Sequence, residues 1–270
     1  MSLKMWSGKN TPAGAGGESK PASGHEGGMG ETIKIIVHAL LIALVVRVFF
    51  YQPFNIPSGS MKSTLLVGDY LFVSKLSYGY SQYSFPYGIV PFSGRVFGSE
   101  PKRGDVAVFK LPRDNSTDYI KRVIGMPGDE IQMRQGVLYI NGQAVPKRRI
   151  EDFKALDEDG IMRSTPRFEE TLPNGVKYTV LDAEPSGPFD NTPAYKVPAG
   201  TYFMMGDNRD NSTDSRALYH VGPVPLENFI GRADLMFFSV ALDEGQSCRL
   251  INPLSWPGCI RWRRIFSLVR

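Results

Sequence analysis

The sequence predicts a mostly β protein. It should have a coiled antiparallel β-sheet domain with a smaller inserted β-rich subdomain, preceded by a single transmembrane helix. One long apolar run stands near the N-terminus, over residues 33–51. After it come short segments rich in β-branched and aromatic residues, bounded by Gly, Pro or Asp. No long amphipathic helix pattern interrupts these segments, which favours an antiparallel, closed or coiled sheet.

The first 30 residues are rich in Gly, Ala, Pro and Ser and have no hydrophobic periodicity. Such a composition cannot bury enough apolar surface to fold, so residues 1–30 are expected to be a disordered tail. The run IKIIVHALLIALVVRVFFY then follows. At 1.5 Å per residue it spans close to the roughly 30 Å of a bilayer core, so we predict a membrane anchor over residues 31–52.

A cleaved signal sequence and a buried core helix are the alternatives for this run. Against cleavage, residues 49–51 are FFY, where small residues would mark a cleavage site. Against a core helix, a polar tail precedes the run and Pro53 follows it. Lysines precede the apolar centre, whereas no basic residue lies between Arg47 and Lys62. The positive-inside rule therefore predicts a cytoplasmic tail and an extracytoplasmic C-terminal body.

The rest of the chain has the pattern of short strands, for example RGDVAVFKL, DYIKRVIGM, GVLYINGQAV and GTYFMMGD. Asn141-Gly142 is typical of a tight hairpin turn. We assign residues 53–146 and 199–270 to the catalytic β domain. Residues 147–198 are polar and turn-rich, which predicts an inserted subdomain that can vary without disturbing the core. Ordinary sheet with long loops is the alternative.

Composition limits the chemistry. The net charge of +4 is mild and no basic cluster suggests nucleic-acid binding. CxxC and HExxH patterns are absent, so we expect no metal and no cofactor. Cys248 and Cys259 could form a disulfide in an oxidising compartment or remain free thiols. The C-terminal WPGCIRWRRIFSLVR suits a membrane interface but could equally cap the core.

Two bases could activate a serine in the segment PSGS, residues 57–60. His220 is the only histidine in the predicted soluble part, but the GxSxG pattern of a nucleophile elbow is absent around Ser60. Lys121, in a predicted strand, would serve only if burial lowered its pKa and left a neutral amine. Taken alone, a lysine in a strand is more often exposed to solvent.

A third polar segment, MGDNRDNSTDSR, occupies residues 205–216. No frame in it fits the spacing of an EF-hand calcium loop. A polar surface turn is one alternative. The other is a buried network in which Ser212, Asp214 and Arg216 satisfy one another and orient a catalytic group.

Together these segments resemble the bacterial type I signal peptidases (leader peptidases), membrane-bound serine proteases with a Ser/Lys dyad. FNIPSGSM resembles the nucleophile box of that family, RGDVAVFK and DYIKRVIGMPGD its lysine boxes, and GDNRDNSTDSR its closing box. The resemblance runs from about Arg47 to Ala233. Ser63 stands where many members have Pro, and ALYH after Arg216 looks slightly longer than usual.

The resemblance implies a role for each matched residue. Ser60 would be the nucleophile and Lys121 the general base. The Ser60 backbone N–H and the Ser58 hydroxyl would form the oxyanion hole, with Gly59 allowing the turn. Ser212 would bind and orient Lys121, with Asp214 and Arg216 behind it. Residues Ile56, Pro57, Met61, Leu65 and Tyr119 would line the pocket for the residue before the cut, and Phe54, Asp118 and Ile120 the pocket two residues earlier.

The resemblance also implies the partners and the location. The substrates would be exported preproteins, cut after small residues in an A-x-A pattern, and membrane lipid and the secretion machinery would be further partners. The enzyme would be a single-pass protein of the bacterial cytoplasmic (inner) membrane. A specialised maturation peptidase of the same clan, acting on one secreted or pilus-type protein, and a non-catalytic membrane-anchored scaffold are the alternatives.

Overall fold

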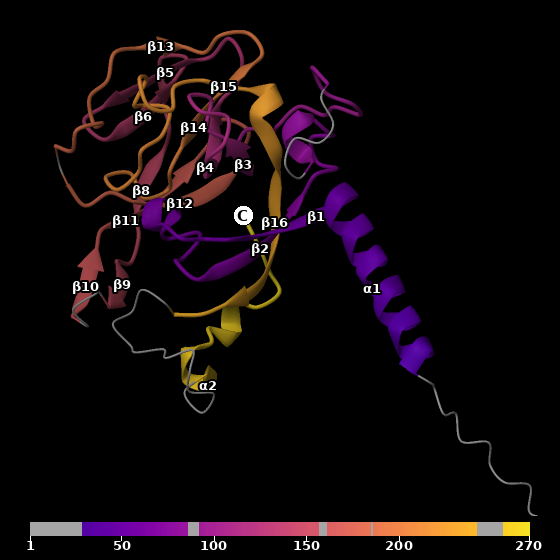
Figure 1. Cartoon of the computed structure of the whole chain (residues 1–270). Helices are drawn as coiled ribbons and strands as arrows, with labels where there is room; N and C mark the ends of the chain where they lie inside the picture. Colours follow the sequence, from indigo (N-terminus) through magenta and orange to yellow (C-terminus); the bar gives the residue numbers. More distant parts are fainter. Residues whose placement is uncertain (1–28, 86–91, 157–160, 185, 242–255) are drawn as a thin grey trace, which may run out of the picture. The chain divides into compact units, whose positions relative to one another are not determined.

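The computed structural model describes residues 29–85, 92–156, 161–184, 186–241 and 256–270 (Figure 1). Helix α1 (Met29–Phe49) is long and apolar enough to cross a membrane. It begins two residues before the predicted anchor, and its end at Phe49 is followed almost at once by a strand that begins at Tyr51. The contacts divide the chain within α1, between Leu41 and Ile42. The paragraphs below concern the unit from Ile42 onward.

The main sheet confirms the predicted antiparallel β architecture. Its strand order is β1-β2-β16-β3-β4-β14-β15, with β17 paired to β16. The strands are β1 (Tyr51–Asn55), β2 (Asp69–Ser74), β3 (Val106–Lys110), β4 (Asp118–Gly125), β14 (Thr201–Met205), β15 (Val224–Pro225), β16 (Phe229–Ser239) and β17 (Ser267–Leu268). The long strand β16 pairs with β3 at one end and with β2 further along, and its bulges curve the sheet (Figure 1).

The junction between α1 and the sheet leaves little freedom. The Lys75 amide donates to the Phe50 carbonyl (3.0 Å), which continues the antiparallel pairing of β1 with β2. The Lys75 side chain is buried, and its Nζ donates to the Val48 carbonyl at 3.3 Å. Burial, reinforced by the charge of Arg47, lowers the pKa of Lys75 to about 8. The last turn of α1 is therefore bonded directly to the body.

A second sheet has the order β13-β5-β6-β7. Its strands are β5 (Glu130–Arg134), β6 (Val137–Ile140), β7 (Gln143–Ala144) and β13 (Tyr195–Lys196). The hairpin turn predicted at Asn141-Gly142 joins β6 to β7, and both residues have positive φ, 53° and 76°. This is the backbone that a tight two-residue turn requires.

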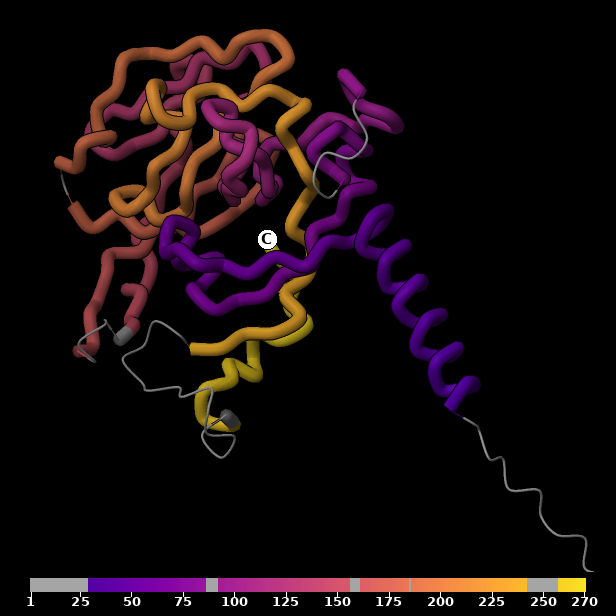
Figure 2. The backbone as a smooth tube through the Cα atoms, viewed as in Figure 1, coloured from indigo at the N-terminus to yellow at the C-terminus, as the bar shows by residue number. Residues whose placement is uncertain are grey.

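The inserted segment contains the sheet β12-β11-β8 and the hairpin β9-β10, which projects from the body (Figure 2). The strands are β8 (Lys147–Arg149), β9 (Phe153–Leu156), β10 (Met162–Thr165), β11 (Arg167–Thr171) and β12 (Lys177–Leu181). Residues of β12 share one hydrophobic core with β4, β5 and β14.

This inserted segment makes buried contacts with the rest of the body, so the expectation that it can vary without disturbing the core stays a prediction. Glu170 and Tyr178 are buried and both bond Arg209, whose Nη1 lies 2.9 Å from Glu170 and whose Nη2 lies 3.0 Å from the Tyr178 hydroxyl. The backbone of Leu181 also bonds Asp207 and Arg209, each at 2.8 Å. Strand β12 is therefore joined to the segment that carries the third sequence motif.

The C-terminal segment contains α2 (Trp256–Cys259), a 3₁₀ turn (Trp262–Arg264) and β17. Arg264 donates to the Thr64 carbonyl (2.9 Å) and pairs with buried Asp69 (2.6 Å). Val269 packs against the core cluster that contains Met61 and Leu65. The segment therefore caps the core. The Trp262 side chain is exposed, so the predicted contact of this segment with lipid stays a prediction. Two further 3₁₀ turns lie at Gln82–Ser84 and Leu226–Asn228.

Of the two cysteines predicted to form a possible disulfide, the structure describes only Cys259. Cys259 is buried and disulfide-bonded. Cys248 lies outside the described residues, so the pairing of the two stays a prediction.

The buried contact between Glu170 and Arg209 gives a stability prediction. Glu170→Ala leaves a guanidinium buried without its partner, so the free energy of unfolding should fall by about 3–5 kcal/mol. The neighbouring Glu169→Ala removes only surface ion pairs with Arg148 and Lys177, which solvent screens, and should lower stability far less. Urea denaturation in mild detergent measures both. Equal effects of the two substitutions would contradict the role assigned to the buried pair.

Candidate active site

The segment that follows β1 forms a tight turn around Ser60. A short 3₁₀ turn covers Gly59–Met61, and the Lys62 amide closes it on the Gly59 carbonyl at 3.0 Å. The Met61 and Leu65 side chains are fully buried in the cluster beneath the turn. They hold the turn against the sheet, and neither lines the cleft beside Ser60. In this structure Met61 and Leu65 therefore do not line the cleft as predicted.

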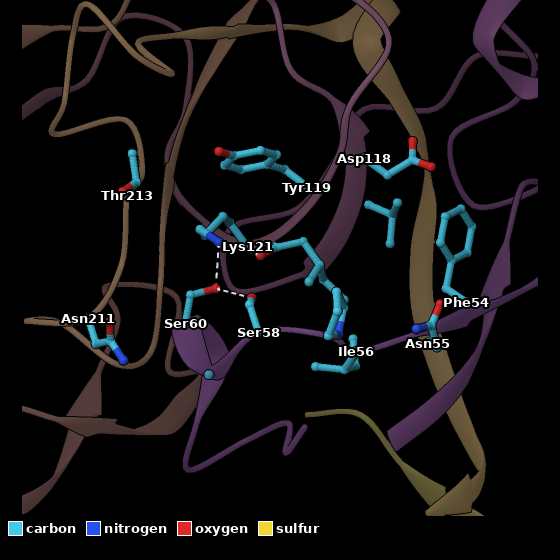
Figure 3. Close-up of a pocket in the computed structure, with 14 residues that line it drawn as sticks. Phe54, Asn55, Ile56, Ser58, Ser60, Asp118, Tyr119, Lys121, Asn211 and Thr213 are labelled. Atoms are coloured by element: carbon cyan, nitrogen blue, oxygen red, sulfur yellow. Dashed lines mark hydrogen bonds between the residues drawn. The ribbon is translucent and has the colours of Figure 1, made fainter. Parts of the chain in front are cut away.

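The cleft has a volume of about 480 Å³ and collects most of the predicted site (Figure 3). Its lining residues are Phe54, Asn55, Ile56, Pro57, Ser58, Gly59, Ser60, Val108, Asp118, Tyr119, Ile120, Lys121, Asn211 and Thr213. They come from β1, the 3₁₀ turn, β3, β4 and the 205–216 segment, so the three sequence motifs meet here.

Lys121 and Ser60 form the central contact of the cleft. The Lys121 Nζ donates to the Ser60 Oγ at 2.7 Å, and the lysine is only 4% exposed (Figure 3). Burial lowers the pKa of Lys121 to about 8, against the opposing charges of Asp214 and Asp207. The amine is therefore readily deprotonated near neutral pH and lies within proton-transfer distance of the hydroxyl.

The carboxylates near the lysine have partners of their own. Asp207 accepts two hydrogen bonds from buried Arg122, at 2.9 and 2.7 Å. Asp214 is paired with Arg216 in the same way, at 2.9 and 2.8 Å. Burial opposes ionisation of Asp214, but the charge and hydrogen bonds of Arg216 hold its pKa below the usual value. Both acids are thus engaged by guanidinium groups.

The predicted contact between Ser212 and Lys121 is not among the hydrogen bonds of the described residues. The Ser212 hydroxyl donates instead to Asp214 at 2.8 Å, and the second acceptor for Lys121 Nζ is the Ile120 carbonyl at 3.0 Å. Ser212 belongs to the predicted buried network with Asp214 and Arg216, but an orienting role toward the lysine stays a prediction.

The turn around the serine also differs from expectation in its backbone. Gly59 has no positive φ; the residue that does is Ser63, at 86°. Proline is fixed near −65°, so it could not occupy this conformation. The Ser63 hydroxyl donates to the Thr179 carbonyl of β12 at 3.0 Å. The serine at this position therefore ties the turn to the inserted segment.

Oxyanion donors are available beside Ser60. The Ser58 hydroxyl lies 3.3 Å from the Ser60 Oγ. The amide groups at the start of a 3₁₀ turn have no acceptor within that turn, which leaves the Ser60 N–H available. A carbonyl oxygen placed between these two donors would be polarised.

Several contacts at the site were missed by sequence reasoning. Asn208 donates its side-chain amide to the Gly59 carbonyl (3.0 Å) and its backbone amide to the Ser60 carbonyl (3.1 Å). A Cβ on Gly206 would lie 2.1 Å from the Ser212 Oγ and 2.6 Å from the Ser60 carbonyl oxygen. The dense polar composition of residues 205–216 indicated a buried network. It could not identify the atoms of this segment that contact the turn around Ser60.

His220 is exposed and does not line the cleft, and no hydrogen bond among the described residues joins it to Ser60. The structure therefore does not support the histidine alternative. Elsewhere, the carboxylates of Asp182, Asp190 and Asp210 lie within 4.8 Å of one another. Protein donors already bind them: Lys147 pairs with Asp182, and backbone amides bind the other two.

Comparisons with known proteins agree with the motifs. The family model described as signal peptidase, peptidase S26, matches residues 29–238. Signal peptidase I of Rickettsia prowazekii (strain Madrid E) is 43% identical over 241 residues, which is 84% of this chain and 89% of that protein. The corresponding protein of Rickettsia typhi (strain ATCC VR-144 / Wilmington) has the same identity and coverage.

Among solved structures, a signal peptidase I from Enterococcus faecalis V583 is 27% identical and covers 50% of this chain and 97% of that one. Its TM-score of 0.28 is too low to support an argument about the fold.

The close approach at Gly206 gives a prediction. Gly206→Ala should lower the free energy of unfolding by about 1–3 kcal/mol, because the added methyl group overlaps the Ser212 hydroxyl and the backbone of Ser60. Gly258→Ala is the control, since a Cβ there meets nothing within 4 Å and should change stability by less than about 0.5 kcal/mol. Thermal unfolding in detergent compares them, and an unchanged midpoint for Gly206→Ala would rule out the clash.

Proposed function

We propose that Ser60 and Lys121 are the catalytic dyad of this chain, which belongs to the signal peptidase family, peptidase S26. As a member, the chain is a serine endopeptidase that removes signal peptides. The observation that carries the dyad is the 2.7 Å hydrogen bond from the buried Lys121 amine to the Ser60 hydroxyl.

The reaction follows from this geometry. The neutral Lys121 amine takes the Ser60 proton as the serine oxygen attacks the carbonyl carbon of the scissile peptide bond. The Ser58 hydroxyl and the Ser60 N–H stabilise the resulting oxyanion. The Lys121 ammonium then protonates the leaving amine, which breaks the carbon–nitrogen bond and leaves an acyl-enzyme. Lys121 next takes a proton from a water molecule as the water oxygen attacks the acyl carbon. The ester bond to Ser60 Oγ then breaks, the Lys121 ammonium returns the proton to that oxygen, and the signal peptide leaves with a free carboxylate.

The cleft favours small residues before the cut. Its lining includes the apolar side chains of Phe54, Ile56 and Ile120. Bulky substrate side chains would clash with such walls, so we assign to the chain a preference for the A-x-A pattern. A panel of precursors would distinguish a general signal peptidase from a maturation peptidase that acts on a single protein.

The location is inferred from α1. This helix would anchor the enzyme in the bacterial cytoplasmic membrane as a single span, with the tail in the cytoplasm and the body outside. The exposed Trp262 ring and the aromatic residues at the end of α1 are candidate contacts with lipid headgroups. The secretion machinery, which delivers precursors to the same membrane, is the remaining proposed partner.

The dyad is tested by substitution. Ser60→Ala and Lys121→Met should each abolish cleavage of a precursor at its signal junction, and the double variant should be no worse than either one, because the two groups act as a unit. His220→Ala should retain substantial activity. The measurement is kcat/KM on a purified precursor, with unfolding midpoints to confirm folding. Full activity in either single variant would exclude the mechanism.

The pKa of Lys121 predicts a pH profile. Only the neutral amine can accept a proton, and with a pKa of about 8 roughly a tenth of the enzyme is in that form at pH 7. We expect kcat/KM to rise about tenfold per pH unit below pH 7.5 and to level off above pH 9. A profile that is flat from pH 6 to pH 9, or that falls, would contradict a lysine base.

The proposed topology predicts protease protection. When protease is added to spheroplasts, which expose the outer face of the cytoplasmic membrane, the C-terminal body should be digested. An epitope placed in residues 1–28 should survive until the membrane is lysed, because the tail lies in the cytoplasm. Immunoblotting for both parts makes the measurement, and the reverse protection pattern would refute the orientation.

A further inference from the structure

Two cleft residues have no part in the mechanism above. Asn211 and Thr213 line the same cleft as the dyad. Figure 3 shows them on one side of Ser60, whereas Phe54 and Asp118 lie on the opposite side. The nucleophile therefore stands between two groups of lining residues that come from different parts of the chain.

The backbone that carries these residues is fixed relative to the nucleophile. The Asn211 amide donates to the Asn208 carbonyl at 3.2 Å, and Asn208 in turn bonds the carbonyls of Gly59 and Ser60. Thr213 stands between Ser212 and Asp214, both buried and hydrogen-bonded to each other at 2.8 Å. A wall built this way is preorganised, so binding to it requires little ordering of the protein.

The two side chains are themselves available to a ligand. Both residues are exposed, and neither side chain has a hydrogen-bond partner among the described residues. The amide of asparagine offers a donor and an acceptor, which match the carbonyl and N–H of a peptide backbone. Threonine presents a hydroxyl and a methyl group on a stiff, branched side chain. These groups suit an extended peptide lying against the wall.

We propose that Asn211 and Thr213 bind the first residues of the mature protein, those that follow the scissile bond. The inference rests on the proposed function, in which residues before the cut occupy the side of Phe54 and Asp118. A peptide whose scissile carbonyl lies at Ser60 must then continue over Asn211 and Thr213. Asn211 holds the peptide backbone, and Thr213 limits the size of the side chain directly after the cut.

The test uses the full-length enzyme in detergent and precursors that differ only in the residue after the cut, Ala or Leu. Thr213→Ser removes one methyl group and should raise kcat/KM for Leu relative to Ala by about tenfold, the low end for one methyl group in a binding pocket. Thr213→Val keeps the shape and should leave this ratio unchanged. Asn211→Ala should lower kcat/KM for both precursors by about three- to tenfold, the loss of one neutral hydrogen bond.

Phe54→Ala is the matched control on the opposite side of Ser60. It should change the preference for the residue three positions before the cut and leave the Leu-to-Ala ratio after the cut as in the unmodified enzyme. If Thr213→Ser leaves that ratio unchanged, or shifts the preference before the cut instead, the inference is overturned while Ser60-dependent cleavage still supports the proposed function. If the unmodified enzyme cuts no precursor, both fall.

Discussion

A lysine that must lose its proton inside the protein is the constraint on which this structure depends. Burial favours the neutral amine of Lys121, but an unpaired carboxylate nearby would favour the charged form and cancel that effect. The two acids in its surroundings, Asp207 and Asp214, are each held by a buried guanidinium. The arginines therefore offset part of the negative field that favours the protonated lysine, and the Arg216 charge itself lowers the pKa of Lys121.

The need to pair the buried charges near Lys121 involves residues far from the cleft. Buried ions need complete sets of partners, and the partners here come from distant parts of the chain. The loop that carries Asp207 also carries Arg209, whose guanidinium bonds Glu170 and Tyr178 of the inserted segment. Ser63, next to the nucleophile turn, reaches the same segment at Thr179. A region that looks peripheral in the sequence is thus part of the framework that supports the dyad.

The sequence was informative where the signal is local. Short β-branched and aromatic segments bounded by Gly, Pro or Asp predicted the strands, Asn141-Gly142 predicted its turn, and three motifs pointed to Ser60 and Lys121. It failed where the answer depends on partners far along the chain. Nothing local distinguishes a buried glutamate from its exposed neighbour, or shows that Met61 packs downward into the core. The acceptor for the Ser63 hydroxyl is likewise supplied by β12, 116 residues further along the chain.

The short connection between α1 and the cleft has a consequence for which precursors can be cut. Residues 50–59 are all that separate the end of α1 from the nucleophile, and a fully extended chain covers at most about 3.5 Å per residue. Pairing with β2 and a hydrogen bond from the Lys75 amide to the Phe50 carbonyl hold this stretch in place. With α1 as anchor, it acts as a tether that keeps Ser60 within on the order of 40 Å of the helix end. Under the proposed function, a cleavable sequence placed farther from the membrane would therefore remain out of reach of Ser60.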